Sequence, residues 1–505
     1  MNPPRLTIAV PAAWLAAHRA LLTLLETLWP VEFSDAPVRA VAARICHEAP
    51  GPHDDCPHVL VVPAPLAGTP GAAGQPGAAQ VRFADDPAVP WPYRARTIAT
   101  RLALVATSAP GAGERVLAHD AAGRVLWSVD DAHGRYLGRS HLPLCLLQCP
   151  PGADTAGAPL AQLAGAECFV QLLPLFELAR VTCGAARPVR LPYHARPPLC
   201  ASFIVDDPNL HRPTYGYVDY QAIALHAARE RYHVGVATIP LDAWYAHPTA
   251  VAVFGRHREQ LSLLIHGNDH ARNELAQGYT PLRSRQLLHQ AITRIEALER
   301  RTGLQVGRVM VPPHGACSAA MLAQLPAHGF DAVCVSVGSL LACNPGQPWT
   351  RNIGFAPIER IEGCAVLQRW SLTAVTHDVL LAAAYLGQAL ILRAHHQDLR
   401  HGLDVFGDAA RFINSLGEVQ WADLGTLARP GNPGTDPATA RAAGDAAVPQ
   451  PGASPTAPAP AAAGLAGVWR QAWPVPELVP EHHPTQARLI LRRLLTEARD
   501  RLRLG

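Results

Sequence analysis

The stretch ASFIVDDPN, residues 201–209, decides the expected fold, because it predicts a buried strand that ends in two acidic residues. The run ASFIV is typical of a strand with both faces covered. It is followed at once by Asp206 and Asp207. Two adjacent carboxylates at such a strand end are unfavourable unless a cation or a proton separates their roles. A turn or helix cap at Asp207, Pro208 and Asn209 is the alternative explanation of the pattern.

Similar apolar runs recur across the following two hundred residues and alternate with helical patterns, as in a mostly parallel sheet or barrel. We expect strands at 201–205, 234–239, 261–265, 308–311, 332–337, 389–393 and 418–421. Helical patterns between them include 220–230, 282–300, 319–327, 375–385 and 408–416. A segment of about 230 residues with seven or eight strands has the size of one barrel. The predicted fold class is α/β, a distorted (β/α) barrel of seven or eight strands preceded by a smaller α/β domain.

The smaller domain is predicted at 1–195, and its role is not indicated by any motif. Its expected elements are strands at 6–10, 58–63 and 124–129, helices at 14–28 and 160–181, and a Gly/Ala/Pro-rich loop at 64–79.

The rest of the chain divides into three parts. The barrel domain is predicted at 196–429. Residues 430–467 are rich in Pro, Ala and Gly and are expected to form a linker. Residues 468–505 contain an amphipathic helical pattern, expected to dock on the body of the protein. A helix that binds a partner or a membrane surface is the alternative for this last part.

The composition excludes several classes of protein. With 505 residues, 49% hydrophobic and 16% charged, the chain is neither disordered nor fibrous. Its 43 basic residues, all Arg, face 40 acidic ones, a balance too even for nucleic acid as the main partner. The absence of Lys excludes a Lys Schiff base and a Walker-type phosphate loop. The eleven Cys, none in a Cys-x-x-Cys pair, are expected to be mostly reduced and buried.

Two sequence features concern where in the cell the protein is located. The chain has no uninterrupted apolar run of about 18 residues, so we expect no membrane span. No signal-peptide pattern is evident at its start, and we expect a cytoplasmic protein. The sequence does not indicate an oligomeric state.

The motif HGNDH, residues 266–270, follows the expected strand at 261–265. Its two His, His266 and His270, are four residues apart and point the same way if the chain turns helically after Gly267. Both imidazoles then reach one metal ion, with a nearby carboxylate as a further ligand. In a chain with 24 His, a chance pair at this spacing is the alternative.

Two further motifs follow expected strands. VPPHG, residues 311–315, contains a rigid double Pro, and Pro313 and His314 are expected to form a wall of a substrate pocket. An ordinary rigid turn is the alternative. In HHQD, either His395 or His396 is a candidate proton donor, oriented by Asp398 or Asp404, the alternative being a surface His pair at a helix start.

Aromatic residues lie between the first two motifs. Tyr215 and Tyr217 are expected near the mouth of the barrel, where they would stack on a sugar and donate hydrogen bonds to it. Packing against the rim is the alternative, and the same two readings apply to Trp244 and Tyr245.

Four motifs resemble, in order and spacing, those of the metal-dependent polysaccharide deacetylases, carbohydrate esterases with a NodB homology domain: FIVDDP, HGNDH, VPPHG and ILRAHHQD. The resemblance covers about residues 199–425. It implies that Asp206 is the general base and that His395 or His396 is the general acid. The metal ligands that it implies are Asp207, His266 and His270.

The sequence departs from the family pattern in three places. Pro208 and Asn209 follow the acidic pair where the family usually has Gly. Val311 replaces the Arg that opens the third motif, and His314 takes its aromatic position. Arg308 and Arg212 are the candidates to replace the missing Arg, whose usual role is to orient the base.

The expected chemistry is hydrolysis of an N-acetyl or other acyl group on a carbohydrate or polysaccharide. Two imidazoles and a carboxylate suit Zn²⁺ best, with Co²⁺ or Fe²⁺ as alternatives. The expected partner is therefore an N-acylated carbohydrate substrate. Two other functions remain open: a glycoside hydrolase that uses Asp206 with a second carboxylate, and a carbohydrate-binding or assembly protein without turnover.

Overall fold

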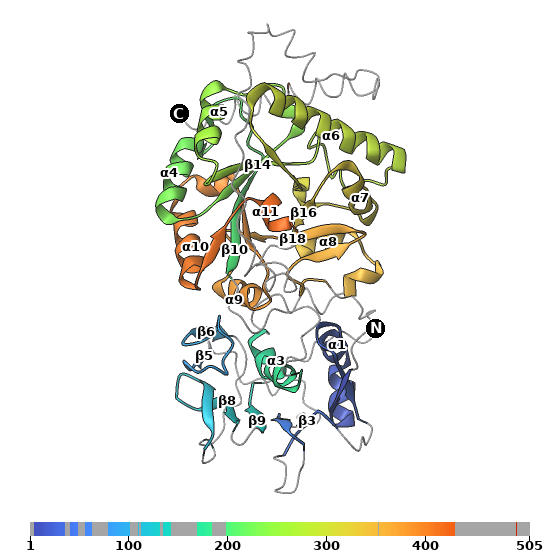
Figure 1. Ribbon diagram of the computed structural model, residues 1–505, viewed down its shortest axis with the longest axis vertical. Helices are drawn as coiled ribbons and strands as arrows, with labels where there is room; N and C mark the ends of the chain where they lie inside the picture. The colour runs from blue at the N-terminus through green and yellow to red at the C-terminus, as the bar shows by residue number, and fades with distance from the viewer. Residues whose placement is uncertain are drawn as a thin grey trace, which may run out of the picture. The chain divides into compact units, whose positions relative to one another are not determined.

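The chain forms two compact units in the computed structural model (Figure 1). The first comprises Met1–Arg196, Pro348–Ala356 and Thr376–Gly387, and the second comprises the rest. The structure describes residues 5–35, 41–48, 56–62, 79–100, 110, 113–131, 135–142, 169–183, 198–351, 353–429 and 491.

Three predicted segments therefore lie largely outside the described residues. They are the linker at 430–467, the C-terminal segment at 468–505, of which only Leu491 is described, and the loop at 64–79, of which only Ala79 is described.

The first unit contains a nine-stranded mixed sheet. Its order is β2-β1-β3-β4-β9-β8-β7-β5-β6, parallel from β2 to β9 and antiparallel from β9 to β6. Three described α-helices belong to the same unit: α1 (Ala12–Leu28), α3 (Phe169–Cys183) and α9 (His377–Tyr385). The strands are β1 (Leu6–Ala9), β2 (Val31–Ser34), β3 (Ala43–Cys46), β4 (His58–Val61), β5 (Ala79–Phe83), β6 (Thr97–Thr100), β7 (Arg115–His119), β8 (Val125–Asp130) and β9 (Tyr136–Ser140).

The second unit contains a ten-stranded sheet that is parallel except at the β17–β18 pair. The order is β17-β18-β16-β15-β14-β13-β10-β20-β19, with β21 paired to β10. The strands are β10 (Leu199–Asp206), β13 (Val234–Thr238), β14 (Leu261–Ile265), β15 (Val306–Met310), β16 (Ala332–Val335), β17 (Glu359–Ile361), β18 (Cys364–Gln368), β19 (Trp370–Ser371), β20 (Leu390–His395) and β21 (Val419–Trp421).

The mixed α/β class agrees with the prediction, but the predicted barrel is not found as a closed sheet. The strand order is a path that ends at β19, and no pairing joins that strand back to β17 or β18. The strands β18 and β19 are nevertheless separated only by Arg369. β18 pairs with β16, and β19 pairs with β20. One short stretch of chain therefore contributes a strand near each end of the strand order.

One hydrophobic core is shared by the parallel strands and α11 (Leu424–Ala428). It takes side chains from seven strands, and the helix contributes three of its five residues. The cluster consists of Cys200, Ile204, Ala237, Leu264, Val309, Val311, Ala332, Cys334, Ala365, Leu367, Ala389, Ile391, Leu424, Leu427 and Ala428.

Local sequence explains where the helices begin and end. The side chain of Asp219 accepts a hydrogen bond from the backbone of Ala222 at the start of α4, and Thr280 caps α6 in the same way ahead of Pro281. Gly303 ends α6 in the left-handed conformation. The helices are α4 (Tyr220–Glu230), α5 (Pro248–Arg256), α6 (Pro281–Thr302), α7 (Ala319–Gln324), α8 (Val337–Cys343), α9 (His377–Tyr385) and α10 (Asp404–Ser415).

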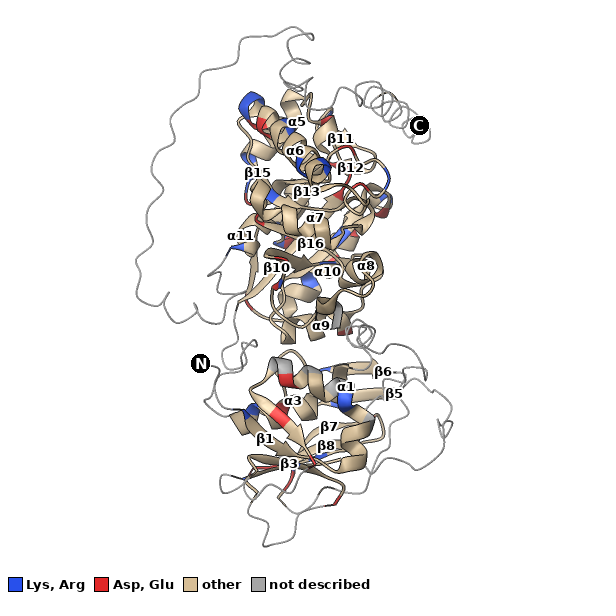
Figure 2. Ribbon diagram, turned by 90° about the vertical axis from the view of Figure 1, so that its right-hand side faces the viewer, with Lys and Arg blue, Asp and Glu red and all other residues tan. Residues whose placement is uncertain are grey.

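Arg positions and acidic positions are interspersed along the ribbon of both units (Figure 2). No helix among the described residues is both long and apolar enough to cross a membrane.

We predict that buried His233 makes the second unit less stable in mild acid. Burial lowers its pKa from the ordinary 6.5 to about 4. Between these values the unfolded chain takes up a proton that the folded chain does not, so stability falls as the pH falls through this window. Between pH 7 and pH 4, the unfolding free energy of the wild type should fall by up to about 3 kcal/mol more than that of a His233→Gln variant. Urea unfolding of both proteins at pH 7 and pH 4 measures the difference.

Exposed His401 provides the control for this experiment. A His401→Gln variant should follow the wild type at both pH values. The prediction is contradicted if the difference in unfolding free energy between the wild type and His233→Gln is the same at pH 7 and pH 4.

Candidate active site

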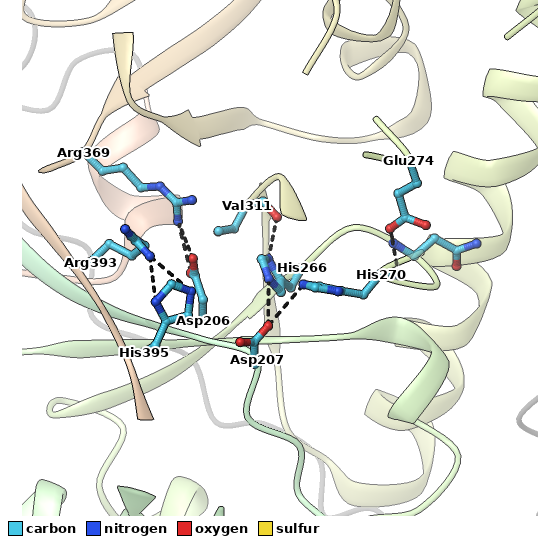
Figure 3. Close-up of polar contacts among 10 residues, drawn as sticks. Asp206, Asp207, His266, His270, Glu274, Val311, Arg369, Arg393 and His395 are labelled. Carbon is cyan, nitrogen blue, oxygen red and sulfur yellow. Dashed lines mark hydrogen bonds and ion pairs between the residues drawn. The ribbon is translucent and has the colours of Figure 1, made fainter. Parts of the chain in front are cut away.

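The chemical motifs meet at one edge of the sheet in the second unit. Because β10, β14, β15 and β20 run parallel, their carboxyl ends lie at a common edge. Asp206 ends the first of these strands and His395 ends the last, and the two are partners in the strand register. His266 follows β14, and Val311 follows β15. Figure 3 shows these side chains converging.

Asp206 forms a buried ion pair with Arg369. Both of its carboxylate oxygens lie close to Nη1 of Arg369, at 3.0 and 3.1 Å. The carboxylate residue is 2% exposed and the Arg 5% exposed, so each charge depends on the other for compensation. Asp206 is thereby held in one orientation.

Arg369 was not predicted from the sequence. Of the two candidates named from the sequence, Arg308 pairs with Glu299 and Arg212 is exposed, and Arg369 takes the place beside Asp206 instead. The sequence does contain a signal for the strand that precedes Arg369. Glu362 and Gly363 form a tight turn with positive φ, and the apolar run CAVL follows it, which is typical of a hairpin strand.

Asp207 faces away from this pair and toward two imidazoles. Its φ of +84°, in the left-handed region, turns the chain directly after the strand. Its Oδ1 lies 3.3 Å from Nε2 of His266 and 3.2 Å from Nε2 of His270. Burial acts to raise the pKa of Asp207, but the hydrogen bonds and charges of the two imidazoles outweigh it and hold that pKa far below its usual range.

The arrangement of His266 fits a bound cation. Its Nδ1 donates to the carbonyl oxygen of Val311 at 2.8 Å, so the neutral ring has its lone pair on Nε2. That lone pair faces the Asp207 carboxylate, and two acceptors at this distance repel each other unless a proton or a cation lies between them. The ligand atoms of Asp207, His266 and His270 all lie within 4.8 Å of one another. Two imidazole nitrogens and one carboxylate oxygen are a common ligand set for Zn²⁺.

His270 reaches this cluster by a different route from the one predicted. The chain after Gly267 does not turn helically but forms an irregular loop. Gly267 and His270 both have positive φ, +64° and +54°. A non-glycine residue in this region is strained and persists only where its surroundings enforce it. The two His do meet at Asp207, although the helical turn expected from their spacing is wrong.

The VPPHG loop forms another side of the cluster. The ring of His314 packs edge-on to that of His270, with 4.8 Å between centroids, and its φ of +56° is again strained. Pro313 is buried, against Gly267. The backbone carbonyl of Val311, rather than its side chain, is what this loop contributes to His266.

The structure separates the two candidate acids. The ring nitrogens of His395 lie 2.8 and 3.1 Å from Nη1 of Arg393. A reciprocal cap also joins His395 to Asp398, because the ring accepts from the backbone N–H of Asp398 and the Asp398 carboxylate accepts from the backbone N–H of His395. Of the two predicted orienting residues, Asp398 is therefore in contact with His395. Arg393, which lies inside the quoted motif, was missed.

His396 contacts a small hairpin instead. The strands β11 (Thr214–Tyr215) and β12 (Val218–Asp219) form this hairpin. The ring of Tyr215 meets His396 edge-on at 5.4 Å, and that of Tyr217 is nearly parallel to it at 6.2 Å. Gly216 is required between them, since any Cβ there would overlap the imidazole. The predicted aromatic residues thus gather at His396.

Trp244 and Tyr245 form a separate aromatic group with His211. Ring centroids lie 4.8 Å apart for His211 and Trp244, and 5.8 Å apart for Trp244 and Tyr245.

Comparisons with known proteins were made for the whole chain. No model of a known family matches it, and no curated protein does. Among solved structures it is similar to Agd3, a novel carbohydrate deacetylase, with 11% identity, 84% of this chain and 86% of that chain covered, and a TM-score of 0.49. It is also similar to a family 4 carbohydrate esterase from Streptomyces lividans (13% identity, 43% and 90% covered, TM-score 0.28).

A third similar structure is a CE4 esterase from Streptococcus mutans (16% identity, 45% and 85% covered, TM-score 0.26). The solved structures named here are carbohydrate deacetylases and esterases.

We predict that the Asp206–Arg369 pair is coupled in stability. An Arg369→Met variant leaves a buried carboxylate without its partner, which should cost about 3 to 5 kcal/mol of unfolding free energy. Adding Asp206→Asn to this variant removes the charge and should restore a large part of the loss. Urea unfolding of the single and double variants measures the coupling.

The control is Arg308→Met, which breaks a half-exposed pair with Glu299. Its cost should stay near or below about 1 kcal/mol. A double variant no more stable than Arg369→Met alone would show that the buried charge is not the cause.

Proposed function

We propose that this chain is a metal-dependent hydrolase that removes an N-acetyl or other acyl group from a carbohydrate or polysaccharide. The observation that carries the proposal is the division of the acidic pair. Asp206 points to a buried Arg, while Asp207 points to two His whose ligand atoms lie next to its own. One carboxylate is thus available as a base and the other as a ligand.

The metal would be held by Asp207, His266 and His270, with Zn²⁺ the expected ion and Co²⁺ or Fe²⁺ as alternatives. When bound, such an ion supplies Lewis acidity, which polarises an acyl carbonyl and acidifies water. His266 is prepared for this role, because Val311 fixes the tautomer that presents Nε2.

Asp206 is the proposed general base. Its ion pair with Arg369 keeps the carboxylate oriented and ready to accept a proton from the attacking water. The pair also explains how a carboxylate can remain in so buried a position without serving as a ligand.

His395 is the proposed general acid, in preference to His396. It lies beside Asp206 in the strand register, and Arg393 and Asp398 hold its ring in place. A proton delivered from this position would reach the departing amine of the substrate. His396 lies among the tyrosines of the hairpin.

The proposed substrate contacts are the hairpin and the VPPHG loop. Tyr217 is 36% exposed, so its ring has a face available for a sugar, and Tyr215 lies beside it. In the loop, His314 is exposed next to His270, and Pro313 is buried next to Gly267. Aromatic faces and hydrogen-bond donors together are typical of carbohydrate sites.

We also infer that the sheet of the second unit is a distorted barrel. The stretch from β18 to β19 contributes to both ends of the strand order, and side chains from seven strands share one core with α11. Arg369 lies between these two strands, which would place the partner of Asp206 at the point of closure.

The alternative functions fit the geometry less well. A glycoside hydrolase needs two carboxylates on either side of the bond, and here Asp207 is turned toward two imidazoles. A binding protein without turnover has no need for the buried charge of Asp206 beside those imidazoles.

The proposal predicts different losses from the two carboxylates. Asp206→Asn should keep bound Zn²⁺ and lose acetate release from N-acetylated oligosaccharides by about 10² to 10⁴-fold, since the base is removed and the three proposed metal ligands are retained. Asp207→Asn and His270→Ala should lose both metal and activity. Elemental analysis of the purified proteins, together with an acetate assay, measures the two properties separately.

Exposed His401 again serves as a control, and His401→Ala should retain metal and activity. Acetate release that is indifferent to a chelator, or equal in Asp206→Asn and the wild type, would contradict the proposal.

A further inference from the structure

The loop between His266 and α6 encloses a second buried carboxylate that none of the roles above uses. Glu274 is 2% exposed and accepts three hydrogen bonds from consecutive backbone N–H groups. They come from Asn268 at 2.6 Å, Asp269 at 3.0 Å and His270 at 3.0 Å. The last of these contacts is visible in Figure 3. Glu274 thus organises the backbone of the whole segment that leads to His270.

Three N–H groups converging on one anion determine the path of the chain. Such a concave set of amides forms only when the backbone follows a tight turn, and the anion stabilises that turn. Here the turn ends at His270, whose φ of +54° is otherwise unfavourable for a residue with a side chain. The same residue presents Nε2 to Asp207 at 3.2 Å. The conformation that places this ligand atom is therefore the one that the Glu274 carboxylate stabilises.

There is no space for a side chain between Gly267 and this carboxylate. A Cβ atom at Gly267 would overlap both Oε1 of Glu274 and the ring of Pro313. Gly267 also has a φ of +64°, which favours glycine for a second reason. The carboxylate, the proline and the loop backbone are thus in close contact, and the loop cannot shift without moving one of them.

The positive charge of Arg294 binds two side chains of the same loop. Arg294, 2% exposed on α6, donates from Nη1 to Oδ1 of Asn268 at 2.7 Å and to Oδ1 of Asp269 at 2.6 Å. Nδ2 of Asn268 in turn donates to Gln290 at 2.8 Å. The loop is bound to α6 by these contacts and to Glu274 by its amides. It is held by two opposite charges.

We propose that Glu274 is a positioning residue of the metal centre, which holds His270 in the conformation that brings its Nε2 to the other two ligands. The inference rests on the metal site proposed above. Glu274 is not itself a ligand in this arrangement, because its oxygens are directed to the three amides. Its contribution is to form the site before the ion binds, so that the binding energy is not spent on ordering the loop.

The test compares Glu274→Gln with the wild type. The Gln side chain has the same shape as Glu, but one of its two oxygens is replaced by an NH₂ group. That group cannot accept a hydrogen bond from a backbone N–H, as the carboxylate oxygen did. We expect the affinity for Zn²⁺, measured by competition with a chromophoric chelator, to fall tenfold to a hundredfold. In the metal-free protein we expect hydrogen exchange of the amides of 268–270 to become at least tenfold faster. The Co²⁺-loaded variant should show an altered visible absorption spectrum at saturation.

Glu299→Gln provides the matched control. Glu299 also accepts a backbone N–H, that of Val306, and pairs with Arg308, but it lies near the amino end of β15, opposite the proposed metal site. This variant should retain wild-type affinity, spectrum and exchange in the loop. Glu274→Asp keeps the negative charge and should recover part of the Zn²⁺ affinity lost by Glu274→Gln.

The outcomes separate the two proposals. If the wild type binds Zn²⁺ and Glu274→Gln binds it equally well, with unchanged loop exchange, the role of Glu274 is overturned and the metal site stands. Equal losses in Glu274→Asp and Glu274→Gln would also overturn it. Faster exchange throughout β14 in Glu274→Gln would indicate general unfolding, which contradicts a positioning role. A wild type that binds no Zn²⁺ overturns both proposals.

Discussion

The structure of the site depends on one electrostatic constraint, which is that two adjacent carboxylates end a buried strand. Asp206 and Asp207 cannot share one environment, because like charges at this distance in a buried position repel strongly. The chain separates them by a left-handed turn at Asp207. One carboxylate then pairs with Arg369, and the other meets His266 and His270. The proposed division into base and ligand is a direct consequence of this separation.

The compensating groups come from distant parts of the chain, and the parallel sheet brings them together. Arg369 is 163 residues from Asp206 in sequence. It reaches Asp206 because it follows β18 at the same edge of the sheet. His395 reaches its place by direct pairing of β20 with β10. Because the strands run in the same direction, the short motifs that follow them lie together at one edge of the sheet.

A further set of residues contacts the proposed ligands and the proposed acid and orients them. The carbonyl of Val311 sets the tautomer of His266, and Arg393 contacts the ring of His395. Glu274 collects the amides that precede His270. These contacts hold residues with unfavourable backbone angles, and three of the seven described non-glycine residues with positive φ belong to the site. Strain of this kind persists only where surrounding contacts are strong enough to enforce it.

The sequence by itself determined the local features: strands that end in chemistry, helix caps, and a His pair at a spacing suited to a metal. These follow from short-range periodicity and residue type, which do not depend on distant contacts. Only the tertiary structure decided that Arg369, rather than Arg308 or Arg212, pairs with Asp206. Several Arg were equally plausible in sequence, and the choice between them was made by strand order. It also separated His395, which ends β20 beside Asp206 in the strand register, from His396, which starts the turn after that strand and packs against the hairpin of Tyr215 and Tyr217.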